Sequence, residues 1–392
     1  MKLLRRIGSA LQPKKVGWAA PRLEGFLSDH TSSEEIVEIR TEPPTIYAER
    51  GREGTHLNFD FAVEGLTDRH LDLVFLKVAA YDAGGELNAY RYLNRNAVGP
   101  SGIESIGNTQ IQGREVMDLF NPFHTFPREP LPARLRFMFT FRDRITGEEF
   151  YCSDVNVAPT VYRQKVALLL PVRGLVTVLD GHDYFSHHRR FAMTLARNAT
   201  GGRMQSNFAR YALDFVHIGH DGNTRLMPDG ERSANHDFHF PDARRFYSDG
   251  APVYSPAAGE VVVAVDDRPD LYEGAFDFDA AVAADRVHDL AGNYVVVRHN
   301  EGEYSHLFHF QQGSLRIEVG QQVTAGQHLG DIGFSGAATV YSHLHYQLMD
   351  GPDFLIDAAL PATFHRFTLV TGRRRRRWRN STIDTVDVLT SR

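Results

Sequence analysis

A regular alternation of apolar and polar or small residues begins near residue 57 and returns near residue 135. The apolar positions of these two segments are Leu57, Phe59, Phe61, Val63, Leu135, Phe137, Phe139 and Phe141. Because successive side chains of a strand point to opposite faces of a sheet, this period of two predicts strands with one buried face. Glycine-containing turns such as YDAGGEL and DRITGEEF lie between strand-like segments. The pattern therefore predicts an Ig-like β-sandwich over residues 41–160.

A second β-rich region follows the junction NVAPTVYRQK. Glycine interrupts short valine-rich segments there, in PVYSPAAGEVVVAV, GNYVVVRH and VGQQVTAGQHLGDIGFSG. Turns at such short intervals favour a compact antiparallel β architecture over a parallel sheet with crossover helices. The acidic stretch 266–290 interrupts the pattern, and we expect an inserted, solvated loop there, with contact to a substrate as the alternative. The whole chain is thus predicted to be all-β.

Both ends of the chain differ from the two β regions. Residues 1–40 have no strong period and are predicted to form an arm, whose basic start is a surface helix or frayed tail rather than a weak membrane-surface anchor. Residues 371–392 contain the run GRRRRRWRN. Such a run is typically a solvated terminal segment, and the alternative is a patch that contacts anionic polymers or the surface of a membrane.

Composition narrows the classes of function. Hydrophobic residues make up 42% of the 392 residues, which is enough for two or three folded domains. The net charge of −6 excludes a basic field over the whole chain and so argues against dedicated nucleic-acid binding. The single cysteine, Cys152, cannot form an internal disulfide. No signal peptide is evident, and no run approaches the ~18 apolar residues of a transmembrane helix. We therefore expect a cytoplasmic protein unless export uses an unconventional or partner-dependent route.

Candidate chemistry lies in three short segments of the second β region. In YSHLHYQL, His343 and His345 share one face of an extended segment, and the apolar residues between them point the other way. Two such histidines are either ordinary strand residues or part of a metal site. Asp214 in RYALDF lies among apolar residues, where an aspartate needs a cation or a metal, and Arg210 is the alternative partner. His309 in EYSHLFHF is a further candidate.

These segments together resemble a known family of peptidases. RYALDF, PVYSPAAGEVV, GNYVVVRH, EYSHLFHF, GSLRIEVGQQVTAGQHLGDIGFSG and HLHYQL occur in an order and spacing similar to the lysostaphin/LytM-type zinc metallopeptidases. The resemblance covers residues 165–370. It implies an open antiparallel β core with a long groove, and a zinc-dependent endopeptidase that cleaves peptide cross-links, usually those of peptidoglycan.

The resemblance also implies roles for individual residues. Asp214 and His345 match the positions of zinc ligands, and His343 and His309 match the catalytic positions beside the metal. We assign proton transfer with the attacking water to His343 and stabilisation of the carbonyl oxygen to His309, although the two roles can be exchanged.

One position departs from the family pattern. Family members commonly carry a zinc-binding histidine four residues before the aspartate, and this chain has Arg210 there. Because a guanidinium stays protonated, it cannot bind zinc. We hypothesise that Asn207 supplies the missing ligand through its amide oxygen. The other candidates are His217, His220 and the pair His187 and His188, although the SHHRR segment could instead hold carboxylates through its arginines.

The sequence therefore predicts a zinc metalloendopeptidase that hydrolyses peptide bonds, with peptidoglycan cross-links as the expected substrate. The alternative is a non-catalytic LytM-like binding module that regulates other cell-wall hydrolases. Some relatives have lost zinc ligands, and Arg210 at the position of a zinc ligand is consistent with such a loss. The expected partners are peptidoglycan or another peptide substrate and, through the arginine-rich segment, an anionic polymer or membrane surface.

Overall fold

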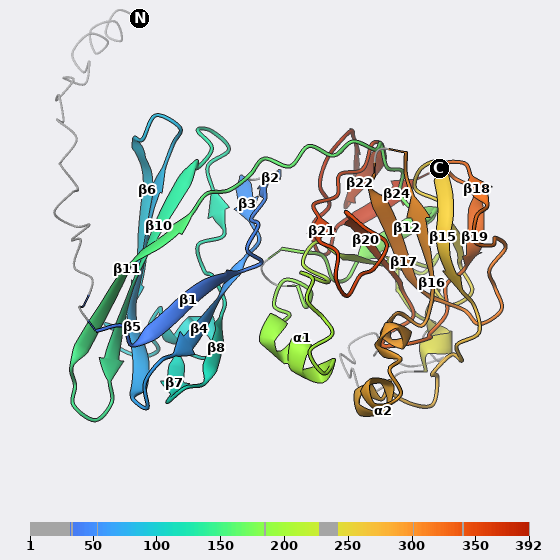
Figure 1. Ribbon diagram of the computed structural model, residues 1–392. Coiled ribbons are helices and arrows are strands. Elements are labelled where there is room, and N and C mark those ends of the chain that lie inside the picture. Colours follow the sequence, from blue (N-terminus) through green and yellow to red (C-terminus); the bar gives the residue numbers. More distant parts are fainter. Residues whose placement is uncertain are drawn as a thin grey trace, which may run out of the picture.

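Two β domains lie side by side in the computed structural model (Figure 1). The structure describes residues 32, 34–52, 54–183, 186–226, 242–300, 302–338 and 341–391. Most of the predicted N-terminal arm, residues 1–31, lies outside the described residues. Within these ranges, no helix is long and apolar enough to cross a membrane.

The first domain consists of three antiparallel sheets and one 3₁₀ turn, η2 (Glu104–Ile106). Its largest sheet has the order β11-β10-β5-β6, with β7 paired to β5. The other two have the orders β1-β4-β8 and β2-β3-β9. The bounds are β1 (Val37–Glu42), β2 (Ala48–Arg50), β3 (Thr55–Leu57), β4 (Asp60–Gly65), β5 (His70–Tyr81), β6 (Leu87–Asn94), β7 (Gln110–Gln112), β8 (Val116–Leu119), β9 (Thr125–Phe126), β10 (Arg134–Asp143) and β11 (Glu149–Val157).

The predicted alternation in the first domain is confirmed by burial. All eight apolar positions of the two alternating segments are at most 1% exposed and belong to one core. Phe61 of β4 meets Phe137 and Phe139 of β10 edge to face, with ring centroids 4.9 and 5.1 Å apart. Since β4 and β10 belong to different sheets, these rings pack the two sheets against each other. The Ig-like topology itself stays a prediction.

The second domain is built on one eleven-stranded antiparallel sheet and a separate pair, β14-β19. The large sheet has the order β18-β15-β16-β17-β20-β13-β12-β24-β22-β23, with β21 paired to β20. The all-β prediction is therefore confirmed. The bounds are β12 (Gly174–Val178), β13 (Leu213–His217), β14 (Pro252–Tyr254), β15 (Gly259–Val265), β16 (Asn293–Arg298), β17 (Tyr304–Phe310), β18 (Gln322–Val323), β19 (His328–Asp331), β20 (Leu344–Met349), β21 (Ala359–Leu360), β22 (Phe367–Thr371), β23 (Arg374–Trp378) and β24 (Val388–Ser391).

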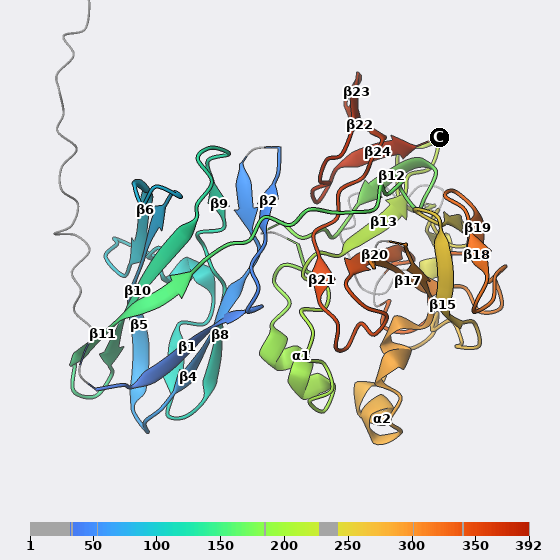
Figure 2. The same ribbon diagram turned by 45° about the horizontal axis from the view of Figure 1, so that its top comes forward.

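Short helical elements interrupt the second domain. The acidic stretch 266–290 contains α2 (Phe278–Ala283) and the start of η4 (Val287–Ala291), and it is largely exposed. η3 (Ala243–Arg245) follows the undescribed residues 227–241. α1 (Met193–Ala199) lies between the two domains in both views (Figure 2). The Thr194 hydroxyl of α1 donates to Asp118 of the first domain, and Arg197 forms an ion pair with Glu42.

The two faces of the large sheet carry different cores. Leu344, Tyr346 and Leu348 of β20 are fully buried in one core, as their alternation predicts. The opposite face packs against α1 and the segment before β13, through residues such as Phe208 and Phe308. His345 points to this second face, so any site built on it lies beside α1.

The arginine-rich segment at residues 371–392 joins this sheet rather than standing apart from it. Its last strand, β24, pairs with β12, so that Leu389 lies opposite Val176. The arginines of β23 form the outer strand of a hairpin with β22 and are exposed. This hairpin lies at the end of the domain away from α1 and α2 (Figure 2).

Candidate metal centre

Antiparallel pairing of β13 with β20 sets Asp214 directly opposite His345. Side chains that face each other across two strands project from the same face of the sheet, with their Cβ atoms about 5 Å apart. His345 Nδ1 lies 3.0 Å from Asp214 Oδ1, and both residues are buried. The pairing therefore joins two candidate ligands that are 131 residues apart in the sequence.

His188 is the third candidate ligand that the structure brings to this pair. It lies in a turn before α1, and its Nε2 is 3.4 Å from Asp214 Oδ2. The rings of His188 and His345 meet nearly at right angles, with centroids 5.0 Å apart. The ligand atoms of His188, Asp214 and His345 all lie within 4.8 Å of one another.

This donor set fits a zinc ion. Two nitrogen or oxygen ligands of tetrahedral zinc, each about 2.0–2.2 Å from the metal, are roughly 3.3–3.5 Å apart. The measured distances from the Asp214 oxygens to the two imidazole nitrogens, 3.0 and 3.4 Å, are close to that value. Two imidazoles and one carboxylate are ordinary zinc ligands that leave one position open. His345 Nδ1 donates to Asp214, and a bound zinc ion would take the place of that proton. His188 Nδ1 and His345 Nε2, the nitrogens that point away from Asp214, have no hydrogen-bond partner among the described residues and can carry the ring proton instead.

The electrostatics of the cluster favour the metal-binding protonation state. Burial tends to raise the pKa of Asp214, but the imidazoles of His188, His343 and His345 outweigh it and hold that pKa below its usual range. Burial is also the largest influence on His188 and lowers its pKa to about 4, against the attraction of Asp214. At neutral pH the site therefore presents an ionised carboxylate and a neutral imidazole, the forms that coordinate metals.

His343 and His309 lie beside this cluster, with ring centroids 4.9 Å apart. The Nδ1–H of His343 donates to the Tyr341 carbonyl, and the Nδ1–H of His309 donates to the Ser335 carbonyl, each at 2.8 Å. Because a neutral imidazole carries one proton, these bonds leave Nε2 of both rings as an acceptor. His343 Nε2 is 3.4 Å from Asp214 Oδ2. The pair can therefore accept protons next to the candidate metal ligands.

The backbone at His309 is bent to direct this side chain. His309 has a φ of 68°, and it is the extra residue where β17 pairs with β16, because Tyr294 pairs with Phe308 and Asn293 with Phe310. Such a bulge re-aims one side chain. A left-handed conformation at a residue other than glycine costs about 1–3 kcal/mol, and strain of this kind is concentrated at functional sites.

A groove of about 640 Å³ opens above these residues. The helix α1 borders it through Leu195, and the acidic insertion contributes Phe278 and Leu290. Its polar lining includes His188, Asp214, His309, His343 and His345, together with Asp180, His187, Thr200 and Tyr341. The insertion at 266–290 thus lines the groove, as the alternative interpretation of that segment expected.

Asn207 is not brought to the cluster. Its Nδ2 donates to the Ala359 carbonyl at 3.1 Å, and its Oδ1 accepts from the Ala359 N–H at 2.5 Å. Both ends of the amide are therefore engaged in holding β21, and His188 lies where the sequence analysis expected Asn207. His217 instead contacts the Arg173 carbonyl, and His220 packs near Tyr247.

Arg210 points away from the cluster to the first domain. Its Nη1 donates to Asp60 Oδ2 at 2.6 Å, so it is not the partner of Asp214. The position at which the family usually carries a zinc ligand is therefore used for a contact between domains.

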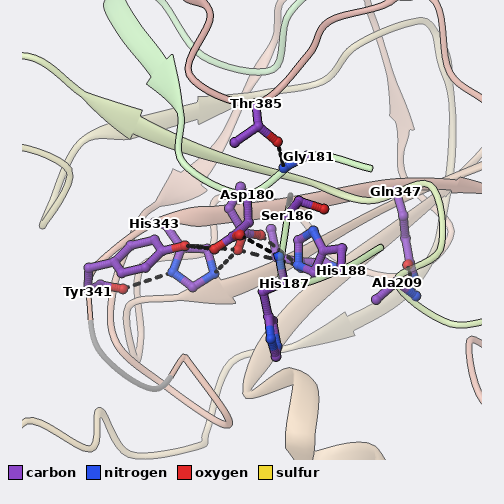
Figure 3. Close-up of polar contacts among 12 residues, drawn as sticks. Asp180, Gly181, Ser186, His187, His188, Ala209, Tyr341, His343, Gln347 and Thr385 are labelled. Carbon is purple, nitrogen blue, oxygen red and sulfur yellow. Dashed lines mark hydrogen bonds and ion pairs between the residues drawn. The ribbon is translucent and has the colours of Figure 1, made fainter. Parts of the chain in front are cut away.

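Two further residues at the site were not among the sequence-based candidates. The Tyr341 hydroxyl donates to Asp180 Oδ2 at 2.8 Å, and Asp180 Oδ1 accepts from the backbone N–H of His187. Figure 3 shows Tyr341, His343 and His188 converging on the region of Asp180. These contacts hold the turn that carries His188. No spacing in the sequence points to them, because Asp180 and Tyr341 are 161 residues apart.

Residues 244–354 match the family model described as Peptidase family M23. The second domain therefore contains a region of peptidase family M23. The resemblance to lysostaphin/LytM-type enzymes that the sequence indicates is thereby confirmed. The matched range of this M23 domain contains His309, His343 and His345, whereas His188 and Asp214 precede it.

Individual relatives of the M23 domain cover part of this chain. Peptidoglycan DD-endopeptidase ShyA from Vibrio cholerae serotype O1 is 30% identical over 155 residues, which are 38% of this chain. The chain spans only 29% of the length of that curated relative. The catalytic domain of lysostaphin from Staphylococcus simulans is 21% identical, with a TM-score of 0.20 and coverage of 30% of this chain and 80% of that chain. A zinc-containing peptidase from Vibrio cholerae is 15% identical, with a TM-score of 0.20 and coverage of 65% and 87%.

We expect Asn207→Ala to lower stability without removing a metal ligand. The substitution leaves the buried N–H and carbonyl of Ala359 without partners, which should reduce the free energy of unfolding by about 2 kcal/mol or more. Metal affinity, measured by competition with a chromophoric chelator, should stay close to that of the unmodified protein. Loss of metal at unchanged stability would instead restore Asn207 as a ligand.

Proposed function

We propose that this chain is a zinc-dependent endopeptidase that cleaves peptide cross-links of peptidoglycan. The main support is the buried cluster of His188, Asp214 and His345 beside two further histidines at the base of a groove. The M23 match and the printed name of the Vibrio cholerae relative support a peptide in the cell wall as the substrate. Such a substrate requires that the protein act outside the cytoplasm, so export is part of the proposal.

In this proposal His188, Asp214 and His345 hold the metal. Zinc bound there would supply a Lewis acid that polarises water and the scissile carbonyl. The rings of Phe308 and Phe208 lie nearly parallel to the His345 ring, with interplanar angles of 8° and 20° and centroids 5.1 and 5.7 Å away, and so restrict its orientation. Asp180 and Tyr341 fix the turn before α1 through hydrogen bonds. Such contacts around a ligand keep it in place.

His343 and His309 act on the substrate in this proposal. His343 accepts a proton from the attacking water at Nε2, since its Nδ1–H is committed to the Tyr341 carbonyl. Burial, together with His343 and His345, holds the pKa of His309 well below its usual range, so its Nε2 is an acceptor before the reaction. His309 donates to the carbonyl oxygen only after it takes up a proton, which the negative charge that develops on that oxygen favours. Leu195 and Phe278 at the rim of the groove exclude water from the bound peptide.

The alternative of a non-catalytic binding module was motivated by Arg210. Because His188 can take the place of the missing histidine, Arg210 by itself no longer argues for a lost metal site. Purified protein that contains no zinc after expression in zinc-supplemented medium would favour the binding module.

Single alanine substitutions should separate the ligands from the catalytic histidines. We expect the variants His188→Ala, Asp214→Ala and His345→Ala to lose bound zinc, because each removes a ligand. His309→Ala and His343→Ala should keep zinc while turnover falls by about 10²–10⁴-fold, the usual contribution of a proton-transfer group. Zinc would be measured by elemental analysis and turnover with a cross-linked peptide. Equal metal loss in all five variants would contradict these roles.

Zinc-loaded protein should release new amino groups and soluble fragments from purified peptidoglycan. We expect a chelator to stop the release and added zinc to restore it, because the site depends on a removable metal. The His343→Ala variant, loaded with zinc, is the matched control for contaminating hydrolases. Cleavage of free cross-bridge peptides without cleavage of the polymer would retain the endopeptidase and overturn the proposed substrate.

The arginine-rich segment supports a separate contact with anionic surfaces. A second groove of about 650 Å³ is lined by five arginines and, among the described residues, by no carboxylate; the arginines are Arg173, Arg366, Arg375, Arg377 and Arg379. Alternate residues of β23 point to the same face, so Arg375 and Arg377 are roughly 6.8 Å apart along it. Trp378 also lines this groove, but its indole N–H is buried, so the guanidinium groups are the available donors. These donors suit phosphate groups on a lipid surface.

Binding to phosphatidylglycerol vesicles should therefore depend on this groove. We expect the double substitution Arg375→Gln with Arg377→Gln to weaken binding by roughly 2 kcal/mol at low salt, about 1 kcal/mol for each arginine. A matched control replaces the exposed Arg114 and Arg316 by Gln, which gives the same change in net charge. Cosedimentation at increasing salt would measure both. Equal binding of the two double variants, or binding that salt does not weaken, would contradict the proposal.

A further inference from the structure

One carboxylate of the first domain binds two buried arginines of the M23 domain. Asp60, at the start of β4, accepts from Arg189 Nη1 at 2.5 Å and from Arg210 Nη1 at 2.6 Å, both on Oδ2. Its Oδ1 accepts from the backbone N–H of Asn121 at 2.8 Å. Arg189 and Arg210 are each only 1% exposed. Asp60 is therefore the carboxylate that pairs directly with both guanidinium groups, whereas the buried Glu49 interacts with Arg189 from a greater distance.

Arg189 directly follows His188 in the turn before α1. Its Nη2 also donates to the Phe59 carbonyl of the first domain, and its own carbonyl accepts from Arg210. On the other side, Asp180 accepts from the N–H of His187, and the Ser186 hydroxyl oxygen accepts from the N–H of Arg189. Contacts from both domains therefore fix this turn. The contacts from the first domain are made to Arg189, the residue next to His188.

Arg210 extends the same contact toward β13. Asn58 of the first domain donates to the Arg210 carbonyl at 2.5 Å and to the His182 carbonyl at 3.0 Å. Phe208, two residues before Arg210, stacks on His345. Both chain segments that flank the candidate metal ligands therefore depend on residues 58–60 of the first domain.

We propose that Asp60 is a positioning residue for His188, so that metal binding by the M23 domain depends on the contact of Asp60 with Arg189. The inference rests on the proposed function, because it assumes that His188 binds zinc. Asp60 touches neither the metal ligands nor the groove, and it acts through Arg189.

Removal of this one negative charge should disturb the turn more than any other part of the contact. Without the carboxylate, two buried guanidinium groups face each other, and buried charges without a partner are strongly destabilising. Arg189 lies in a turn without a regular hydrogen-bond ladder, so it can move toward solvent at lower cost than a strand can. That movement displaces the adjacent His188.

The test compares zinc affinity in the full-length variants Asp60→Asn and Glu42→Gln. Glu42→Gln breaks another ion pair between the domains, that of Glu42 with Arg197 of α1, and also removes one negative charge. Asp60→Asn should weaken zinc binding by about 10–100-fold, as is usual for partners of ligands, and Glu42→Gln should leave it near the unmodified value. Affinity would be measured by competition with a chromophoric chelator, and thermal unfolding of the metal-free proteins would be recorded alongside.

A double-mutant cycle separates positioning from general destabilisation. In a His188→Ala background, whose residual zinc affinity would be measured with a weaker competing chelator, Asp60→Asn should cause no further loss, because its effect passes through the missing ligand. Should Asp60→Asn fail to fold, Arg189→Met removes the link and leaves Asp60 and Arg210 as a balanced pair, and the same loss of affinity is expected.

The outcomes distinguish the inference from the function on which it rests. Zinc binding that Asp60→Asn or Arg189→Met leaves unchanged, together with loss of zinc in His188→Ala, overturns the inference and keeps the proposed site. Equal losses in Asp60→Asn and Glu42→Gln also overturn it, because docking in general would then be the cause. Unmodified protein that binds no zinc overturns the proposed function itself.

Discussion

The register between β13 and β20 is the constraint on which the metal centre depends. Leu213 and Phe215 flank Asp214, and Leu344 and Tyr346 flank His345, and all four flanking side chains are buried in one core. A shift of one residue would turn these apolar side chains to the other face and bury a carboxylate or an imidazole in their place. The hydrophobic core on one face of the sheet thus fixes which polar atoms meet on the other.

Because the apolar core on one face of the sheet determines which polar side chains meet on the other, part of the site could be predicted from the sequence. Asp214 and His345 lie in strands, where apolar neighbours at a period of two reveal which way each side chain points. His188 lies in a turn whose position depends on the contact between Arg189 and Asp60, which are 129 residues apart. The local pattern of apolar and polar residues carries no information about such a long-range contact. Asn207 was favoured because it is near Asp214 in the sequence, but its amide holds Ala359. Proximity along the chain carries little information where the backbone is not regular.

The C-terminal segment shows that a strand can also be missed when its sequence has no alternation of apolar and polar residues. β23 is exposed on both faces, so its sequence has no alternation, and the run of arginines predicts a solvated segment instead. The strand forms because it pairs with β22 at the edge of the large sheet. Positive charge on an edge strand also opposes pairing with another molecule. The guanidinium groups of β23 can therefore oppose pairing at the sheet edge and also donate to an anionic surface.

The use of position 210 for docking has an energetic consequence for the proposed enzyme. Position 210 lies in the turn just before β13, where Arg210 binds Asp60, and His188 approaches from another turn held by the same carboxylate. Metal binding and domain docking then share residues, so their free energies are coupled. Because such coupling is reciprocal, whatever strengthens the pairing of Asp60 with Arg189 raises the affinity for the metal, and the bound metal strengthens that pairing by the same factor.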